Sequence, residues 1–344
     1  MKRFFLKILF FASFCLLLHA SIVFILPPDY VTHRVIENIR AENKILFLST
    51  FYPNQSITMN EIGDLAHHTQ DQIWRKDILW VTDKYGFRNK RFLKNPDITF
   101  IGGSFVFGGA LDQNEMLSFK TEEYSNMSSY NLAPSNFNGF LSHLSNGIID
   151  KPKCLVYASI ERNIHHFPEI SNKKSRFNKI KYNSLLLKIF TPFDKIHKSN
   201  YHKYIISRVS GLQGFGIKSP KSDMYFFQGK KVLEFNDINI VAKHADIIQS
   251  YSMFCDSLGI QFIFVPIPNK ETIYFDLIPL NNQPNYLVLL FKELQKRGVL
   301  TIDVLSLFNQ EKNEKLLYHK DDTHWNSNGV DIVAKEITRL ITNI

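Results

Sequence analysis

Apolar positions divide the chain into one long run and several short ones. Residues 8–26 are predominantly apolar and follow Lys2, Arg3 and Lys7. A run of this length is about long enough to cross a bilayer as a helix, and basic residues ahead of it keep the N-terminus in the cytoplasm. The pattern predicts a single-pass anchor over residues 1–28 in the cell inner membrane, with the remaining chain on the periplasmic or extracytoplasmic side. A cleaved signal peptide ending near "LLHAS" is the alternative.

Shorter apolar runs, rich in β-branched and aromatic residues, predict buried strands at "ITFIGG", "KCLVYASI" and "GIQFIFVPIP". Helices are expected over residues 29–48, 114–126, 241–258, 284–297 and 329–343, and a short strand after Gly298. Strands that alternate with helices indicate a parallel sheet covered on both faces. Ligands bind beyond the carboxyl ends of the strands in such sheets, and Ser104 follows the first clear strand.

Residues 171–235 interrupt this alternation and carry an excess of positive charge. Residues 173–231 contain 14 Lys or Arg and two Asp, a net +12 compared with +9 for the whole chain. A solvated insertion outside the sheet is the simplest interpretation. A surface for anionic lipid or an anionic polymer is the alternative, and "YNSLLLKIFTPFDKI" is apolar enough to touch a membrane. Nucleic acid is not an expected partner, because the anchor places this surface outside the cytoplasm.

Two polar stretches contain residues suited to nucleophilic catalysis. "DITFIGGSFVFGG" places Ser104 in a Gly-rich turn after a strand, where a serine is more often structural. "HKDDTHWNSNG" places Asp321, Asp322 and His324 in one loop before the C-terminal helix. A carboxylate so close can fix the imidazole tautomer and stabilise the imidazolium that forms when His324 takes a proton from a serine. We therefore expect Ser104 within hydrogen-bond reach of His324.

In this order the motifs resemble the SGNH (GDSL-like) hydrolase superfamily. Within it they resemble the membrane-anchored, alginate O-acetyltransferase-like branch that is involved in exopolysaccharide acetylation. The matching stretches are "DKYGFRN", "FIGGSFVFGGALDQNE", "YNLAPSN", "PIPNKETIY" and "DDTHWNSNG", and they cover roughly residues 80–165 and 240–344. The resemblance implies an SGNH-type three-layer α/β/α domain with a parallel sheet over residues 81–344, preceded by a linker and lead-in helix over residues 29–80.

The resemblance also implies catalytic roles. Ser104 would be the nucleophile and His324 the base, with Asp322 as the acid and Asp321 as the second choice. Gly103 stands where the "GDS" motif has aspartate. This departure weakens a simple lipase interpretation more than it weakens catalysis.

Further residues are implied around the triad. Backbone N–H groups of Ser104 and Asn136 would form the oxyanion hole with the side chain of Asn163, although "SIERNIHHF", the stretch around Asn163, matches the corresponding stretch of the family poorly. Asn136 replaces the usual glycine, and asparagine tolerates a left-handed backbone better than most residues. Lys270 and Trp325 are the expected substrate-binding residues.

The reaction implied by the resemblance is transfer of an acyl group, above all acetyl, to hydroxyls of a cell-surface or exported polysaccharide. A multi-pass membrane acyltransferase would supply the acyl group, because acetyl-CoA is cytoplasmic. No cofactor or metal is expected: His165 and His166, if on a strand, would point to opposite faces. Two alternatives stay open, an SGNH esterase that deacylates such a glycan and a non-catalytic polysaccharide-binding or assembly factor on a decayed fold.

The topology can be tested with reporter fusions. A reporter fused after Ile344 should be active only outside the cytoplasm, because one span follows the basic N-terminus. Alkaline phosphatase, which is active outside the cytoplasm, and a fluorescent protein that folds inside it give complementary signals. The same reporters fused after Lys7 provide the control of opposite sign. A cytoplasmic signal from the Ile344 fusion would contradict the anchor and the expected glycan substrate together.

Overall fold

A four-stranded parallel sheet lies at the centre of the structure, in the order β4-β3-β5-β8. The strands are β3 (Ile98–Gly102), β4 (Ser129–Asn131), β5 (Cys154–Ile160) and β8 (Gln261–Ile267). The structure, a computed structural model, describes residues 1–25, 32, 34–43, 46–66, 74–171, 183–198, 205–206, 209, 216–227, 238–279 and 283–341. The three strands predicted from apolar runs are confirmed, and β4 is an additional edge strand.

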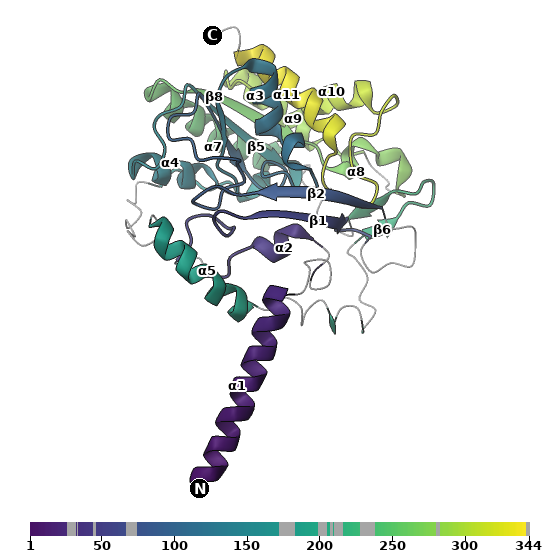
Figure 1. Cartoon of the computed structure of the whole chain (residues 1–344). Helices are drawn as coiled ribbons and strands as arrows, with labels where there is room; N and C mark the ends of the chain where they lie inside the picture. The colour runs from purple at the N-terminus through teal and green to yellow at the C-terminus, as the bar shows by residue number, and fades with distance from the viewer. Residues whose placement is uncertain are drawn as a thin grey trace.

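Alternate side chains of the strands enter two separate cores, because successive residues of a strand point to opposite faces. Val156, for example, joins one core while Tyr157 joins the other. One face is covered by α3 (Leu117–Ser125), α10 (Val304–Glu311) and α11 (Ser327–Ile341), and the other by α4 (Phe137–Ser145), α7 (Ile238–Ser257) and α9 (Tyr286–Lys296) (Figure 1). The chain therefore has the expected α/β architecture, with helices on both faces of a parallel sheet.

The strand register brings three chain segments to one edge of the sheet. Gly102 pairs with Ala158, and Ala158 pairs with Val265. The segments that follow these strands are the Ser104 turn, the 3₁₀ helix η3 (Glu161–His166), and α8 (Lys270–Ile273) with η6 (Phe275–Leu277). The strand expected after Gly298 is reduced to one parallel bridge between Thr301 and Phe264. The carboxyl edge is thus assembled from residues far apart in the sequence.

The lead-in segment is not the helix that the sequence predicts. Among the described residues of 29–48, only α2 (Val35–Ile39) is helical. Arg40 and Phe51 form an antiparallel bridge that turns the chain back, and the hairpin of β1 (Ser56–Ile62) and β2 (Arg75–Val81) follows. The hairpin buries Met59, Ile78 and Trp80 in the same core as α11. The lead-in is therefore part of the domain body.

The N-terminal helix α1 (Lys2–Ile25) projects away from the domain (Figure 1). It is long and apolar enough to cross a membrane, and none of its residues is buried against protein. This agrees with a single span or signal anchor. Which side of the membrane the domain occupies stays a prediction.

The described parts of the basic insertion lie outside the central sheet, as expected. They are α5 (Ser184–Lys198) and a separate hairpin of β6 (Gly216–Lys218) and β7 (Tyr225–Phe227), and residues 172–182 and 228–237 are outside the described part. The hairpin nevertheless contacts the domain body, because Tyr225 N donates to the carbonyl of Lys320 at 2.8 Å and Phe227 N to Glu271 Oε1 at 2.7 Å. Part of the predicted insertion therefore packs on the domain body.

Candidate active site

His324 and Asp322 form a buried acid–imidazole pair. Nδ1 of His324 lies 2.5 Å from Oδ1 of Asp322, and the backbone N–H of His324 donates to the same oxygen at 2.9 Å. The two residues belong to one loop that antiparallel pairing of Tyr318 with Trp325 closes just before α11. The carboxylate therefore fixes the imidazole orientation and leaves Nε2 to act on a substrate or nucleophile.

Both aspartates of this loop are also bound by the end of β1. Asp64 N donates to Asp322 Oδ2 at 2.8 Å, and Gly63 N donates to Asp321 Oδ2 at 2.9 Å. A Cβ at Gly63 would lie 2.2 Å from the backbone oxygen of Asp321, so only glycine permits this approach. The geometry thus places Asp322 beside the imidazole, while Asp321 contacts the lead-in backbone.

A cluster of charges surrounds the acid. Arg34 lies 3.4 Å from Glu61 and 3.9 Å from both Asp64 and Asp322. Burial opposes ionisation of Asp322, but His324, its hydrogen bond and Arg34 outweigh burial and hold the pKa of Asp322 well below its usual range. Asp322 is consequently a carboxylate at neutral pH, the form that can stabilise an imidazolium.

Ser104 lies half-buried in the turn that follows β3, at the carboxyl edge of the sheet. The imidazole of His324 packs against the same loop, with its centroid 4.7 Å from that of Phe105. A Cβ on Gly109 would lie 2.8 Å from His324 Nε2, so glycine lets the ring approach the loop. The structure thus brings the loop of the expected nucleophile onto the expected base.

The predicted hydrogen bond between Ser104 and His324 is absent. Within the described ranges, Nε2 of His324 has no hydrogen-bond partner and faces the backbone of Gly109. Catalytic hydrogen bonds are often long or misaligned without substrate and tighten in the reactive complex. Nε2 therefore has an unused proton-accepting position beside the serine turn.

The stretch "YNLAPSN", which contains Asn136, lies beside this turn. Gly102 and Ser135 exchange two backbone hydrogen bonds, of 2.9 and 3.1 Å, which brings the adjacent Asn136 close to the turn. The φ of Asn136 is −90°, so its tolerance of left-handed backbone is not used, and its side chain caps α4 by accepting from Gly139 N at 2.9 Å. Its backbone N–H stays a candidate oxyanion donor.

Asn163 does not fit its expected position. It is exposed on η3, and across the described chain no hydrogen bond joins it to the Ser104 turn. The neighbouring Arg162 reaches the turn instead, with its guanidinium carbon 5.9 Å from the Phe105 ring centroid and Nη1 donating to Asn269 Oδ1 at 3.2 Å. Arg162 is not among the site residues predicted from the sequence, although it lies in the poorly matched stretch "SIERNIHHF".

Comparison with known proteins identifies the C-terminal part of this site. Residues 222–344 match the ALGX family, described as the SGNH hydrolase-like domain of the acetyltransferase AlgX. The match includes Asp322 and His324, and over these residues it confirms the resemblance seen in "PIPNKETIY" and "DDTHWNSNG". Among curated proteins no match is found.

Solved structures with related folds include a lipase/acylhydrolase from Enterococcus faecalis. It is 10% identical, with a TM-score of 0.36, and the alignment covers 72% of this chain and 95% of that one. A catalytic mutant of Axe2, an acetylxylan esterase from Geobacillus stearothermophilus, is 10% identical, with a TM-score of 0.37 and coverage of 73% and 95%. Likenesses this distant transfer no substrate to this chain. The ALGX match and the Asp322–His324 geometry support an acyltransferase or esterase of the SGNH type.

Lys270 does not have the predicted substrate-binding position. It is 1% exposed, and its ammonium donates to the carbonyls of His319, Lys320 and Asp322 at 2.6, 3.0 and 3.2 Å. An ammonium has three donors, so these carbonyls use all of them. Burial lowers the pKa of Lys270 to about 8. Lys270 thus holds the acid loop and does not face a ligand.

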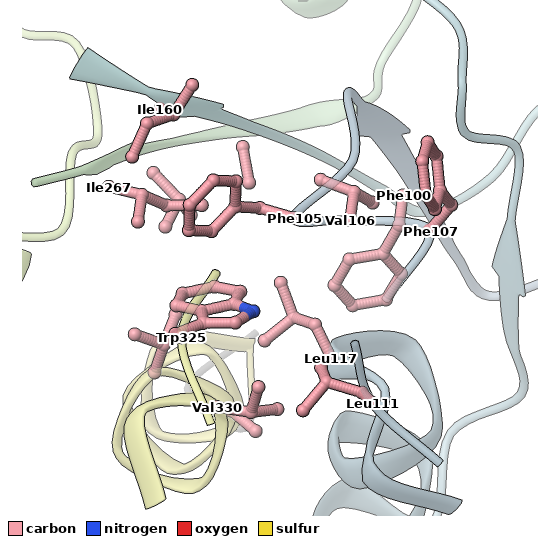
Figure 2. Packing of buried hydrophobic residues seen from close by; sticks show 14 of the residues in the cluster. Phe100, Phe105, Val106, Phe107, Leu111, Leu117, Ile160, Ile267, Trp325 and Val330 are labelled. Carbon is pink, nitrogen blue, oxygen red and sulfur yellow. The ribbon is translucent and has the colours of Figure 1, made fainter. Parts of the chain in front are cut away.

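Trp325 is likewise a core residue and not a substrate contact. It is 0% exposed and packs edge to face against Phe105, with ring centroids 5.7 Å apart. Figure 2 shows it between Phe105 and Val330 in the buried cluster. The indole therefore connects α11 to the serine turn by packing.

Two groups of described residues contain side chains of the kinds that bind metal ions. His165 and His166 lie on the 3₁₀ helix η3, not on the expected strand, and their exposed rings are 3.7 Å apart. Ligand atoms of Asp64, Asp322 and His324 lie within 4.8 Å of one another. The carboxylate of Asp64 accepts a hydrogen bond from Thr323, and Nδ1 of His324 is paired with Asp322. Arg34 supplies the neighbouring positive charge.

Arg88 is a further positioning residue that the sequence analysis did not single out. It is fully buried and donates to the carbonyls of Phe107, Gly108 and Leu111 at 3.1, 2.5 and 2.7 Å. Its guanidinium carbon lies 3.7 Å from the centroid of the Trp80 ring, and burial lowers its pKa to about 9. The signal was present, since Arg88 belongs to the quoted "DKYGFRN" motif.

Replacing the two adjacent aspartates should have very different effects. Asp322→Asn should lower the rate of reaction with an activated acetyl ester by about 10⁴-fold, because an amide facing Nδ1 favours the wrong imidazole tautomer. Asp321→Asn is the matched control, since its amide oxygen can still accept from Gly63 N. Single-turnover kinetics with both variants checks this. A greater loss in Asp321→Asn would reverse the assignment.

Lys270→Met should weaken folding and turnover without weakening glycan binding. Removing the ammonium leaves buried carbonyls unpaired, at a cost of about 1–3 kcal/mol in the free energy of unfolding. We expect a lower melting temperature and kcat with an unchanged KM for the acceptor. Lys320→Met is the control, because its ion pair with Asp223 is exposed and should contribute about 0–1 kcal/mol. A raised KM with normal stability would restore the substrate-binding role.

Proposed function

We propose that this protein is a membrane-anchored O-acyltransferase that acetylates hydroxyls of an exported or cell-surface polysaccharide. The observation that carries the proposal is the buried Asp322–His324 pair, 2.5 Å apart, whose free imidazole edge lies against the Ser104 turn. The ALGX match over residues 222–344 supports acetyl as the transferred group. The apolar helix α1 and the basic residues that precede it support an extracytoplasmic site.

The first half-reaction forms an acyl-enzyme. His324 Nε2 takes the proton of Ser104 Oγ as the oxygen attacks the acyl carbon of the donor. The resulting oxyanion is stabilised by backbone N–H groups of Ser104 and Asn136, and such donors contribute roughly 3–4 kcal/mol each in other enzymes. When the intermediate collapses, the donor's oxygen or sulfur leaves with the proton from His324. The acyl group is then esterified to Ser104.

The second half-reaction transfers the acyl group to the glycan. His324 Nε2 takes the proton of a sugar hydroxyl, whose oxygen attacks the acyl-serine carbonyl. Collapse breaks the Ser104 ester bond and returns the proton to Oγ. Because cytoplasmic acetyl-CoA cannot reach an extracytoplasmic site, the donor is supplied through a multi-pass membrane acyltransferase. Water in place of the sugar would give the esterase reaction with the same residues.

Intact mass measurement tests the acyl-enzyme directly. The full chain incubated with an activated acetyl ester should gain one acetyl group, and peptide mapping should place it on Ser104. Ser104→Ala should gain none. Ser145→Ala is the matched control, because Ser145 is exposed at the end of α4 and should not affect the adduct.

The fate of the acetyl group separates the candidate functions. Once Ser104 is acetylated, added polysaccharide should accept the acetyl group faster than water does. Release to water alone, with no acetylated glycan, would indicate the esterase. A parent chain that never acquires the adduct would indicate the non-catalytic binding factor.

A further inference from the structure

Helix α5 has one face fixed to the protein. Leu187, Thr191 and Asp194 are buried, and Leu187 packs with Ala41, Phe47 and Tyr52 of the lead-in. Asp194 accepts hydrogen bonds from Tyr52 Oη at 2.8 Å, Glu42 N at 2.9 Å and Asn43 N at 3.2 Å. These contacts hold α5 in one orientation on the domain.

The opposite face of α5 is apolar and uncovered. Leu185, Ile189 and Phe193 are 65%, 49% and 67% exposed. At about 100° per residue these three side chains share one stripe, centred roughly opposite Leu187. The helix has a single acidic residue, Asp194, which lies on the buried face, and the exposed Lys188 and His197 flank the apolar stripe. A contiguous apolar stripe that is held outward indicates an interaction surface.

Helix α5 also contacts the apolar helix α1 near its C-terminal end. Nε2 of His19 lies 2.8 Å from the carbonyl oxygen of Ile196, and this contact region leaves His19, Ala20, Ile22 and Val23 only partly exposed. His19 lies six residues before Ile25, the last residue of α1. At a rise of 1.5 Å per residue, this is about 9 Å along the helix. An interfacial helix lies about 5–10 Å into the boundary between head groups and acyl chains.

We propose that α5 lies in the outer surface of the bilayer that α1 spans, with Leu185, Ile189 and Phe193 among the acyl chains. The occupant of the stripe is lipid, because α5 contacts the end of α1, a helix whose own surface is apolar and unburied. The flanking basic side chains have the arrangement that interfacial helices present to head groups. The domain is therefore attached at two places, by the span α1 and by the surface helix α5. This proposal is independent of the acyl transfer reaction.

Depth-dependent quenching in the full chain tests the proposal. The protein, carrying Cys15→Ala, is reconstituted into phosphatidylcholine vesicles with one environment-sensitive label at Ile189→Cys. Lys335→Cys on α11, at the end of the domain far from α1, is the aqueous control, and Leu17→Cys within α1 is the lipid control (Figure 1). The quenchers are aqueous iodide and a phosphatidylcholine with a spin label high on its acyl chain.

We expect lipid quenching at position 189 several-fold stronger than at position 335, with iodide showing the reverse order. Equal quenching at both positions would overturn the proposal. Protection of position 189 from both quenchers would also overturn it, because a second copy of the chain would then cover the stripe. Lack of lipid quenching at position 17 would remove the bilayer from α1 and the proposal with it. None of these outcomes depends on the Ser104 adduct.

Discussion

The buried carboxylate of Asp322 is the constraint on which the rest of the structure depends. A charge removed from water is tolerated only when it is paired and hydrogen-bonded. Here the donors are the imidazole and backbone N–H of His324, the backbone N–H of Asp64, and the nearby guanidinium of Arg34. Half of these donors come from the lead-in, more than 250 residues earlier in the chain, so the acid can be buried only when the hairpin has docked. The lead-in is for this reason part of the active domain and not a tether.

The serine turn is held by a separate set of contacts. Arg88 binds the carbonyls of Phe107, Gly108 and Leu111, and the packing of Phe105 on Trp325 joins the turn to the core beside α11. The acid loop is held in turn by Lys270 and the β1 hairpin. The serine turn and the acid loop thus meet where the imidazole of His324 packs against Gly109. His324 lies against both Phe105 and Gly109 of the turn that contains Ser104.

The sequence predicted the elements whose pattern is strongly periodic, and missed those that depend on distant partners. Four such elements are β3, β5, β8 and α11. Each could be predicted from its own apolar pattern, because that pattern does not depend on which element covers it. The helix expected over residues 29–48 was wrong, because the segment buries its apolar residues by folding back on Phe51 and Tyr52. Lys270 was misassigned because its partners are backbone carbonyls, which leave no mark in a sequence. Trp325 was misassigned because an indole is equally at home in a core and in a sugar site.

The same contacts give the active site a fixed relation to the membrane-proximal end of the domain. Asp194 of α5 binds the lead-in at residues 42, 43 and 52, and the lead-in continues through β1 to Gly63 and Asp64, which bind the acid loop. A flexible tether would leave the Ser104 turn free to face any direction. Under the proposed contact of α5 with lipid, a domain held through α5 and the lead-in would instead present its carboxyl edge at one orientation to the bilayer. Were the acyl donor supplied from within the membrane, as proposed, such an orientation would reduce the search for the donor to the surface of the bilayer.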